Sequence, residues 1–359
     1  MKKRVIVWGT GNVGAPAIRA VLSHQGLELV GVVVNSEAKI GKDAGELAGM
    51  DVVTGVKGTR DWRGLLAAGA DAMVYASLAE ARFEDAIEEV LEFLRAGVNV
   101  VTSTMYLMQY AATTPEPLQT QIKEICEKSG ASLMASGIDP GWGMDSLPFL
   151  LSAISSDITE IRSQEIMNYQ HYDQPDIVRN VVGFGLPMDV TPPMLHEFGL
   201  KMVWGPMVRA LGDALNHKVD EVTTLVERRP LEKDVTAPGM GVFEKGTQGA
   251  FRFEVAGHHK GKKLFVVEHI TRIDNDCAPD WPYPPEGEGC HAVVITGNPI
   301  VHVSVHSEDR FKADSPGAGG NATAACRIVN SIPFVCDAAP GIVHGINIPM
   351  SHGGQQIRV

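Results

Sequence analysis

Short apolar runs alternate with longer stretches of helical spacing over the first 140 residues. The apolar runs predict strands at 5–8, 29–34, 71–77, 99–103 and 132–137, and the amphipathic stretches predict helices at 15–23, 83–96 and 115–129. Strands that alternate with helices in this way pair in parallel through right-handed crossovers. The first part of the chain is therefore predicted to be α/β, with a Rossmann-type doubly wound parallel sheet.

The pattern changes after Gly141. A predicted helix at 144–155 is followed by closely spaced strand-like runs at 158–169, 219–229, 249–259, 263–272, 291–297 and 300–306, with a hairpin turn at 256–261. An apolar helical section at 176–216 is expected to break at Pro187, Pro192, Pro193 and Pro206. The strands look antiparallel, and we expect an α+β domain with an open mixed sheet whose free face can pair with a second subunit. A last helix is predicted at 321–331.

Three glycines follow the first strand with the spacing G-x-G-x-x-G and precede the first helix. Gly9 permits a tight turn, Gly11 lets the backbone approach a pyrophosphate, and Gly14 lets the helix pack closely on the sheet. The N-terminus of the helix then points its N–H groups at the phosphates. The strand before the motif and the helix after it favour a dinucleotide site over an ordinary turn. We expect the cofactor to contact Gly9, Thr10, Gly11, Asn12, Val13 and Gly14.

The end of the second predicted strand bears on the choice of cofactor. NAD-specific folds usually place a carboxylate there for the ribose 2′-hydroxyl, but this chain has Asn35 and Ser36, with Lys39 and Lys42 shortly after. A hydroxyl and an ammonium group bind a 2′-phosphate, and no carboxylate repels it. The sequence favours NADPH and leaves NADH possible; on the alternative interpretation the two lysines are solvated loop charges.

Ligands of open α/β sheets lie beyond the carboxyl ends of the strands. We therefore expect Ser77 and Leu78, at the end of the 71–77 strand, and Thr102, at the end of the next, to contact the nicotinamide ribose. Pro140 lies in a turn just before a predicted helix and is expected to contact the nicotinamide; the alternative is a plain connector.

Composition and charge exclude some classes of partner. Hydrophobic residues make up 44% and charged residues 21% of the 359-residue chain, which is ordinary for a soluble globular protein. The net charge of −12, without a basic stripe, argues against nucleic acid and anionic membranes as partners. Five scattered cysteines, no C-x-x-C spacing and no signal peptide predict a cytoplasmic protein. No apolar run reaches the length of a membrane span.

Three stretches of the sequence resemble a known family: VWGTGNVG at 7–14, GIDPGWGMDSLP at 137–148 and RIVNSIP at 327–333. They are similar to the dihydrodipicolinate reductase-like oxidoreductases, in the branch of 2,4-diaminopentanoate dehydrogenase and the native amine dehydrogenases. The resemblance implies a dinucleotide-binding domain at 1–145 and a substrate and dimerisation domain at 146–315. It also implies that a C-terminal helix and tail at 316–359 return to the first domain, and that the protein is a homodimer.

Two features depart from that family. His258, His259 and Lys260 look like part of the His-His-x-x-Lys element of dihydrodipicolinate reductase, but they lie in a predicted hairpin turn without the rest of the motif. In the amine dehydrogenases, the segment after the fifth strand supplies a glutamate that handles the amine proton. Here Met105 and Tyr106 stand in that place, and a methionine performs no acid–base chemistry.

The candidate proton donors are aromatic residues and a histidine. Tyr169, His171 and Tyr172 lie in the segment 165–173, where we expect them to cluster at a strand edge, and Tyr106 faces the cofactor by resemblance. We take Tyr106, Tyr169 and His171 as the catalytic candidates; alternatively, the aromatic rings wall a pocket. Glu165 is assigned to a polar sheet face. No histidine has convincing metal-ligand spacing, so no metal is expected.

The sequence thus predicts an NAD(P)H-dependent oxidoreductase that moves a hydride between nicotinamide and the C=O or C=N carbon of a small, mostly apolar molecule. Two alternatives remain at this point. One is a non-catalytic NADPH-binding sensor or regulatory protein, because Met105 leaves no certain acid–base residue. The other is a C=C (enone) reductase.

Overall fold

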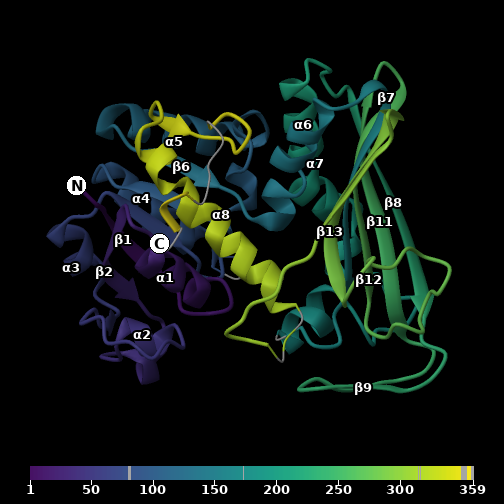
Figure 1. Ribbon diagram of the computed structural model, residues 1–359, viewed down its shortest axis with the longest axis horizontal. Coiled ribbons are helices and arrows are strands. Elements are labelled where there is room, and N and C mark those ends of the chain that lie inside the picture. Colours follow the sequence, from purple (N-terminus) through teal and green to yellow (C-terminus); the bar gives the residue numbers. More distant parts are fainter. Residues whose placement is uncertain (80–81, 173, 314, 316, 349–353, 357–359) are drawn as a thin grey trace. The chain divides into compact units, whose positions relative to one another are not determined.

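The chain forms two compact units in a computed structural model that describes residues 1–79, 82–172, 174–313, 315, 317–348 and 354–356. The first unit comprises Met1–Gly141 and Asn321–Val359, and the second comprises Trp142–Gly320 (Figure 1). Each unit is built on its own sheet. Among the described residues, no helix is long and apolar enough to cross a membrane.

The first unit contains a parallel sheet with the strand order β15-β6-β5-β4-β1-β2-β3. Its strands are β1 (Lys3–Trp8), β2 (Leu27–Val33), β3 (Gly58–Thr59), β4 (Ala72–Tyr75), β5 (Asn99–Thr102), β6 (Ser132–Ala135) and β15 (Gly341–Ile342). The order reverses direction at β1, which carries the glycine loop at its end. The predicted doubly wound parallel sheet is confirmed.

Helices cover both faces of this sheet: α1 (Gly14–Ser23), α2 (Ala44–Leu47), α3 (Trp62–Ala68), α4 (Phe83–Arg95), α5 (Glu116–Ser129) and α8 (Ala318–Cys336). Side chains alternate along β1, so Val5 and Val7 join the core with α1 and α8, and Ile6 and Trp8 join the core with α4 and α5. Short 3-10 turns are η1 (Glu37–Lys39), η2 (Tyr106–Met108), η3 (Ala111–Thr113) and η7 (Gly354–Gln356).

The second unit contains a six-stranded mixed sheet with the order β14-β13-β7-β12-β11-β8 (Figure 1). Its strands are β7 (Ser156–Asn168), β8 (Glu221–Pro230), β11 (Gln248–His259), β12 (Lys262–Arg272), β13 (Gly289–Asn298) and β14 (Val301–Val305). The antiparallel impression is wrong for one pair, because β7 and β12 run parallel. Between β7 and β12 the chain passes through α7 and the strands β8 to β11, which allows that direction. A small ribbon is formed by β9 (Val235–Ala237) and β10 (Gly241–Phe243).

Two helical predictions are wrong at prolines. The second unit has α6 (Ser146–Ser152) and the short turns η5 (Ile177–Val181) and η6 (Pro193–Leu195), but α7 (Glu197–Ala214) runs through Pro206. A proline inside a helix costs about 3 kcal/mol. Burial of Leu200, Met207 and Leu211 against the sheet offsets it, at about 1.5–3 kcal/mol for each side chain. Likewise α8 continues past Ser331 through Pro333, because Ile332 and Val335 are buried.

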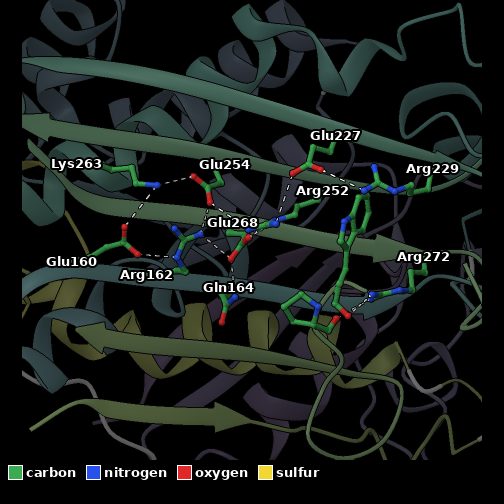
Figure 2. Close-up of polar contacts among 12 residues, drawn as sticks. Glu160, Arg162, Gln164, Glu227, Arg229, Arg252, Glu254, Lys263, Glu268 and Arg272 are labelled. Atoms are coloured by element: carbon green, nitrogen blue, oxygen red, sulfur yellow. Dashed lines mark hydrogen bonds and ion pairs between the residues drawn. The ribbon is translucent and has the colours of Figure 1, made fainter. Parts of the chain in front are cut away.

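The face of the mixed sheet opposite α7 carries a network of charges (Figure 2). Arg162 Nη1 lies 2.6 Å from Glu254 Oε1 and 2.9 Å from Glu268 Oε2, and Arg252 Nε lies 2.5 Å from Glu268 Oε1. Glu268 is only 1% exposed and also accepts a hydrogen bond from Gln164 at 2.7 Å. These residues come from three neighbouring strands, so the network ties β7, β12 and β11 together.

Candidate functional site

The glycine loop forms a cradle at the start of α1. The backbone of Gly9 has φ +111°, and a Cβ there would lie 2.6 Å from the carbonyl oxygen of Ala76. A Cβ on Gly14 would collide with the carbonyl oxygen of Gly9. By contrast, a Cβ on Gly11 would meet nothing within 4 Å and would protrude into the space in front of the loop. Gly9 and Gly14 therefore serve the fold, and Gly11 keeps open the space that a pyrophosphate fits.

Cations gather beside this loop. Lys39 Nζ donates to the carbonyl oxygen of Thr10 at 3.1 Å and to its hydroxyl at 3.0 Å. Arg60, directly after β3, donates through Nε to the carbonyl oxygen of Asn35 at 3.0 Å. Lys42 is turned away and pairs with Glu46 at 2.6 Å. The sequence identified Lys39 but missed Arg60, because β3 is too short to show as a strand.

The other predicted cofactor contacts lie around the loop and the strand ends of the same unit. Asn12 and Val13 belong to the glycine loop, and Ser36 is exposed just before η1. Asn35 Nδ2 donates to the Ser77 hydroxyl at 3.1 Å, which joins the ends of β2 and β4. Leu78 is exposed, whereas Thr102 is buried at the end of β5. The carbonyl oxygen of Pro140 accepts a hydrogen bond from Gln109 at 3.2 Å.

The segment after β5 places a thioether and a phenol side by side in the chain. Met105 is fully buried in the core that contains α4 and α5. Tyr106 begins η2 and is half-buried. Met105 is thus a packing residue, and acid–base chemistry on this segment would fall to Tyr106.

A buried polar row crosses the mixed sheet of the second unit. Glu165 on β7 stands directly opposite His269 on β12 and His291 on β13. Glu165 Oε1 lies 3.6 Å from His269 Nδ1, and Glu165 Oε2 lies 3.4 Å from His291 Nε2. The Tyr169 hydroxyl donates to Glu165 Oε1 at 3.1 Å. We call Glu165, Tyr169, His269 and His291 the Glu165 cluster.

Aromatic rings enclose the Glu165 cluster. The ring of Tyr169 stacks on Tyr172 with centroids 4.6 Å apart, and its other neighbour is Phe184 at 6.3 Å. His269 stacks on Phe253 at 4.4 Å and meets the edge of Trp204, on α7, at 4.8 Å. The row therefore faces the apolar, helix-covered side of the sheet, where electrostatic interactions are strong.

The charge state of Glu165 follows from these neighbours. Burial alone would raise the pKa of its carboxyl, but attraction by His269 and His291 and the hydrogen bond from Tyr169 outweigh burial and hold that pKa below its usual range. Burial, followed by the negative charge of Glu165, raises the pKa of Tyr172 to about 12. The cluster therefore holds an ionised carboxylate in an apolar environment.

The structure separates the catalytic candidates of the sequence. Tyr169 belongs to the Glu165 cluster, whereas the His171 side chain is exposed and Tyr106 lies in the first unit. The assignment of Glu165 to a polar sheet face is wrong, since the charged face carries its neighbour Gln164. Glu165, His269 and His291 were missed as a group. Only the pairing register of β7 with β12 and β13 reveals them, because it places all three residues in one row across the sheet.

The hairpin between β11 and β12 is confirmed. It turns at Lys260 and Gly261, whose φ values are +51° and +74°. His258 Nε2 lies 2.9 Å from the Thr223 hydroxyl, and His259 Nδ1 lies 2.8 Å from the carbonyl oxygen of Lys218. These side chains are occupied in holding neighbouring strands and the connection before β8.

Comparisons with known proteins match this architecture. Residues 3–111 match the family model of the dihydrodipicolinate reductase N-terminus. The chain is 44% identical over 346 residues to an amine dehydrogenase from Streptomyces virginiae, covering 96% of each sequence. It is 22% identical to 2,4-diaminopentanoate dehydrogenase from Acetoanaerobium sticklandii, covering 97% of this chain and 94% of that one.

A solved structure shows the same fold over the whole length. The amine dehydrogenase from Mycobacterium smegmatis aligns with a TM-score of 0.73 at 21% identity, covering 99% of both chains. At this identity the likeness concerns the fold: a parallel sheet followed by a mixed sheet.

Proposed function

The chain belongs to the amine dehydrogenase family and is an NAD(P)-dependent oxidoreductase, and we propose that it transfers a hydride between nicotinamide and the C=N or C=O carbon of a small, mostly apolar molecule. The glycine cradle is the observation that carries this proposal, because it fits a dinucleotide. The 44% identity to an amine dehydrogenase supports the type of reaction. A non-catalytic sensor is not carried forward, because the named relatives are enzymes. Reduction of a C=C bond stays an alternative outcome of the assay below.

The cationic side chains between residues 160 and 210 already have partners within the second unit, which supports an apolar substrate. Between residues 160 and 210, Arg162 is held in the charged network, and Arg179 Nη2 donates to the carbonyl oxygens of Met240 and Val242. Arg209 donates to a backbone carbonyl, and Lys201 pairs with a glutamate on the same helix. All four are engaged within the unit, which disfavours recognition of a dicarboxylate.

The chain supplies orientation and proton transfer. The cradle Gly9–Gly14 would hold the pyrophosphate. The strand ends at Ser77, Leu78 and Thr102 would contact the nicotinamide ribose, and Pro140 would contact the nicotinamide. When bound, the nicotinamide supplies or accepts the hydride. Tyr169 is our first candidate for the group that handles the substrate proton, since it lies in the Glu165 cluster. Tyr106 is the second, and the exposed His171 is the third.

The direct test is oxidation of NADPH and NADH with a panel of ketones, aldehydes and enones, each with and without ammonium. We expect turnover of ketones that requires ammonium and yields the amine. Ammonium-independent formation of an alcohol would make the protein a carbonyl reductase, and reduction of enones alone would make it a C=C reductase.

NADPH is the proposed preferred cofactor. Lys39 and Arg60 lie beside the glycine loop and the end of β2, where a 2′-phosphate would sit, and no carboxylate occupies position 35 or 36. K39A and R60A are expected to raise KM for NADPH at least tenfold with little effect on NADH. K42A is the matched control, since Lys42 pairs with Glu46. Equal effects on both cofactors would contradict the preference.

A homodimer in the cytoplasm is the proposed working form. We take the charged face of the mixed sheet, opposite α7, as the surface that a second copy would cover. No disulfide joins the five cysteines, all of which are among the described residues, and this is compatible with a reducing compartment. Light scattering on the purified protein is expected to give twice the mass of one chain, and a monomer at micromolar concentration would contradict it.

A further inference from the structure

Glu165 is a buried carboxylate on a strand face whose neighbouring positions carry no charge. Its exposed fraction is 8%, and Ser163 and Met167, two residues away on the same strand face, are uncharged. An ionised group in apolar surroundings costs free energy that an apolar side chain would not. With His269 and His291 opposite it, three adjoining strands each place an ionisable residue in this row. Such a row is characteristic of a functional site.

The hydrogen bond from Tyr169 sets the chemistry that the cluster offers. An ionised carboxylate accepts hydrogen bonds and donates none, so the Tyr169 hydrogen points at Glu165 Oε1. With its hydrogen directed at Glu165, the phenol oxygen can act toward other groups only as an acceptor. An ammonium or iminium nitrogen has N–H bonds to donate and a positive charge that Glu165 attracts, whereas a carbonyl oxygen has neither.

We propose that Glu165 is a positioning residue for amine chemistry, which acts through the Tyr169 hydroxyl on the cationic nitrogen of the substrate. This inference rests on the proposed function, because it specifies how the oxidoreductase selects nitrogen over oxygen. It also gives the chain a carboxylate for a task that the buried Met105 cannot perform. His269 and His291 hold the carboxylate from both neighbouring strands.

The proton step balances in the direction of amine oxidation. One N–H bond of the ammonium breaks and its proton passes to the Tyr169 oxygen, while the original hydroxyl proton of Tyr169 passes to Glu165 Oε1. The positive charge of the ammonium and the negative charge of the carboxylate are thereby cancelled, which low polarity favours. The neutral amine then has a lone pair with which to form the C=N bond, and an oxidised nicotinamide, when bound, would accept the hydride that leaves the carbon.

The test uses the full-length enzyme with E165Q, E165D and Y169F. E254Q is the matched control, since Glu254 is a buried carboxylate on the opposite face of the same sheet. Y283F is the control for Y169F, because it removes a hydroxyl that donates to the carbonyl oxygen of Asn275 at 2.6 Å. The readouts are KM for ammonium, kcat, and calorimetric binding of the amine and the alcohol that correspond to the fastest ketone, with oxidised cofactor present.

We expect E165Q and Y169F to raise KM for ammonium at least tenfold and to abolish the preference for binding the amine over the alcohol. E165D should restore part of both, and E254Q and Y283F should keep both. Wild-type KM and wild-type amine preference in E165Q would overturn the inference while leaving the proposed function intact. Absence of ammonium-dependent turnover in the wild type would instead overturn the proposed function, and the inference with it.

Discussion

Gly11 and Gly14 differ in what they do, although both belong to the same motif. A methyl group on Gly14 would press into the Gly9 carbonyl, so G14A should destabilise the first unit by about 1–3 kcal/mol. A methyl group on Gly11 has open space, so G11A should keep the melting temperature of the cofactor-free protein and weaken cofactor binding at least tenfold.

Thermal unfolding and fluorescence titration with NADPH separate these two effects. The wild type is the reference for both measurements. If G11A bound NADPH as tightly as the wild type, the pyrophosphate would not lie against this loop.

The Glu165 carboxyl also makes a prediction about pH. Its pKa in the folded protein is lowered by His269, His291 and Tyr169 despite burial, and Tyr172 and Cys290 are further titratable neighbours. A lowered folded-state pKa contributes stability that is present above the unfolded-state value and lost as the pH falls. The wild type should therefore lose its stability advantage over E165Q between about pH 4.5 and pH 2. Urea unfolding of both proteins across that range measures the difference, and a constant difference would contradict it.

At the level of residues, the sequence predicted those site residues that lie close together in a local motif. The glycine loop and Lys39 were predictable because their spacing relative to one strand and one helix carries the signal. Arg60 was not, since it follows a two-residue strand. Glu165, His269 and His291 lie far apart in the sequence, and a strand register brings them together.

At the level of elements, burial of apolar side chains determined where two helices end, although the prolines in the sequence predicted earlier breaks. The helices α7 and α8 run through prolines because their apolar faces are buried. The longer strands were predictable to within a few residues, since β-branched runs identify them, whereas the two- and three-residue strands β3, β9, β10 and β15 were not predicted. The parallel pairing of β7 and β12 was not, because pairing direction depends on the path of the chain between them.

The charged network on β7, β11 and β12 predicts a large effect of one substitution. R162A would remove one of the two arginines that pair with both Glu254 and Glu268. Because Arg252 stays beside both carboxylates, the cost should not exceed about 3–5 kcal/mol, which is the cost of breaking a buried ion pair. K201A removes an exposed i,i+4 pair with Glu197 and should cost about 0.5 kcal/mol or less. Guanidinium unfolding at a fixed protein concentration compares the two, and equal costs would show that the network contributes little.

At the level of the whole molecule, the two units have complementary chemistry. The first unit carries the cradle that fits a dinucleotide, and the second carries the Glu165 cluster among aromatic rings. On the proposed function, the first of these sites would hold the cofactor and the second would act on the substrate. The nature of the accepting carbon is the central claim of the proposed function.

The most direct measurement of that claim is isotopic. The enzyme is incubated with NADPH deuterated at C4, a ketone and ¹⁵N-ammonium, and the product is analysed by mass spectrometry. We predict an amine that carries deuterium on the former carbonyl carbon and ¹⁵N on the same carbon. An alcohol that carries deuterium but no ¹⁵N would contradict the expected formation of an amine, and a product without deuterium would contradict hydride transfer from the cofactor.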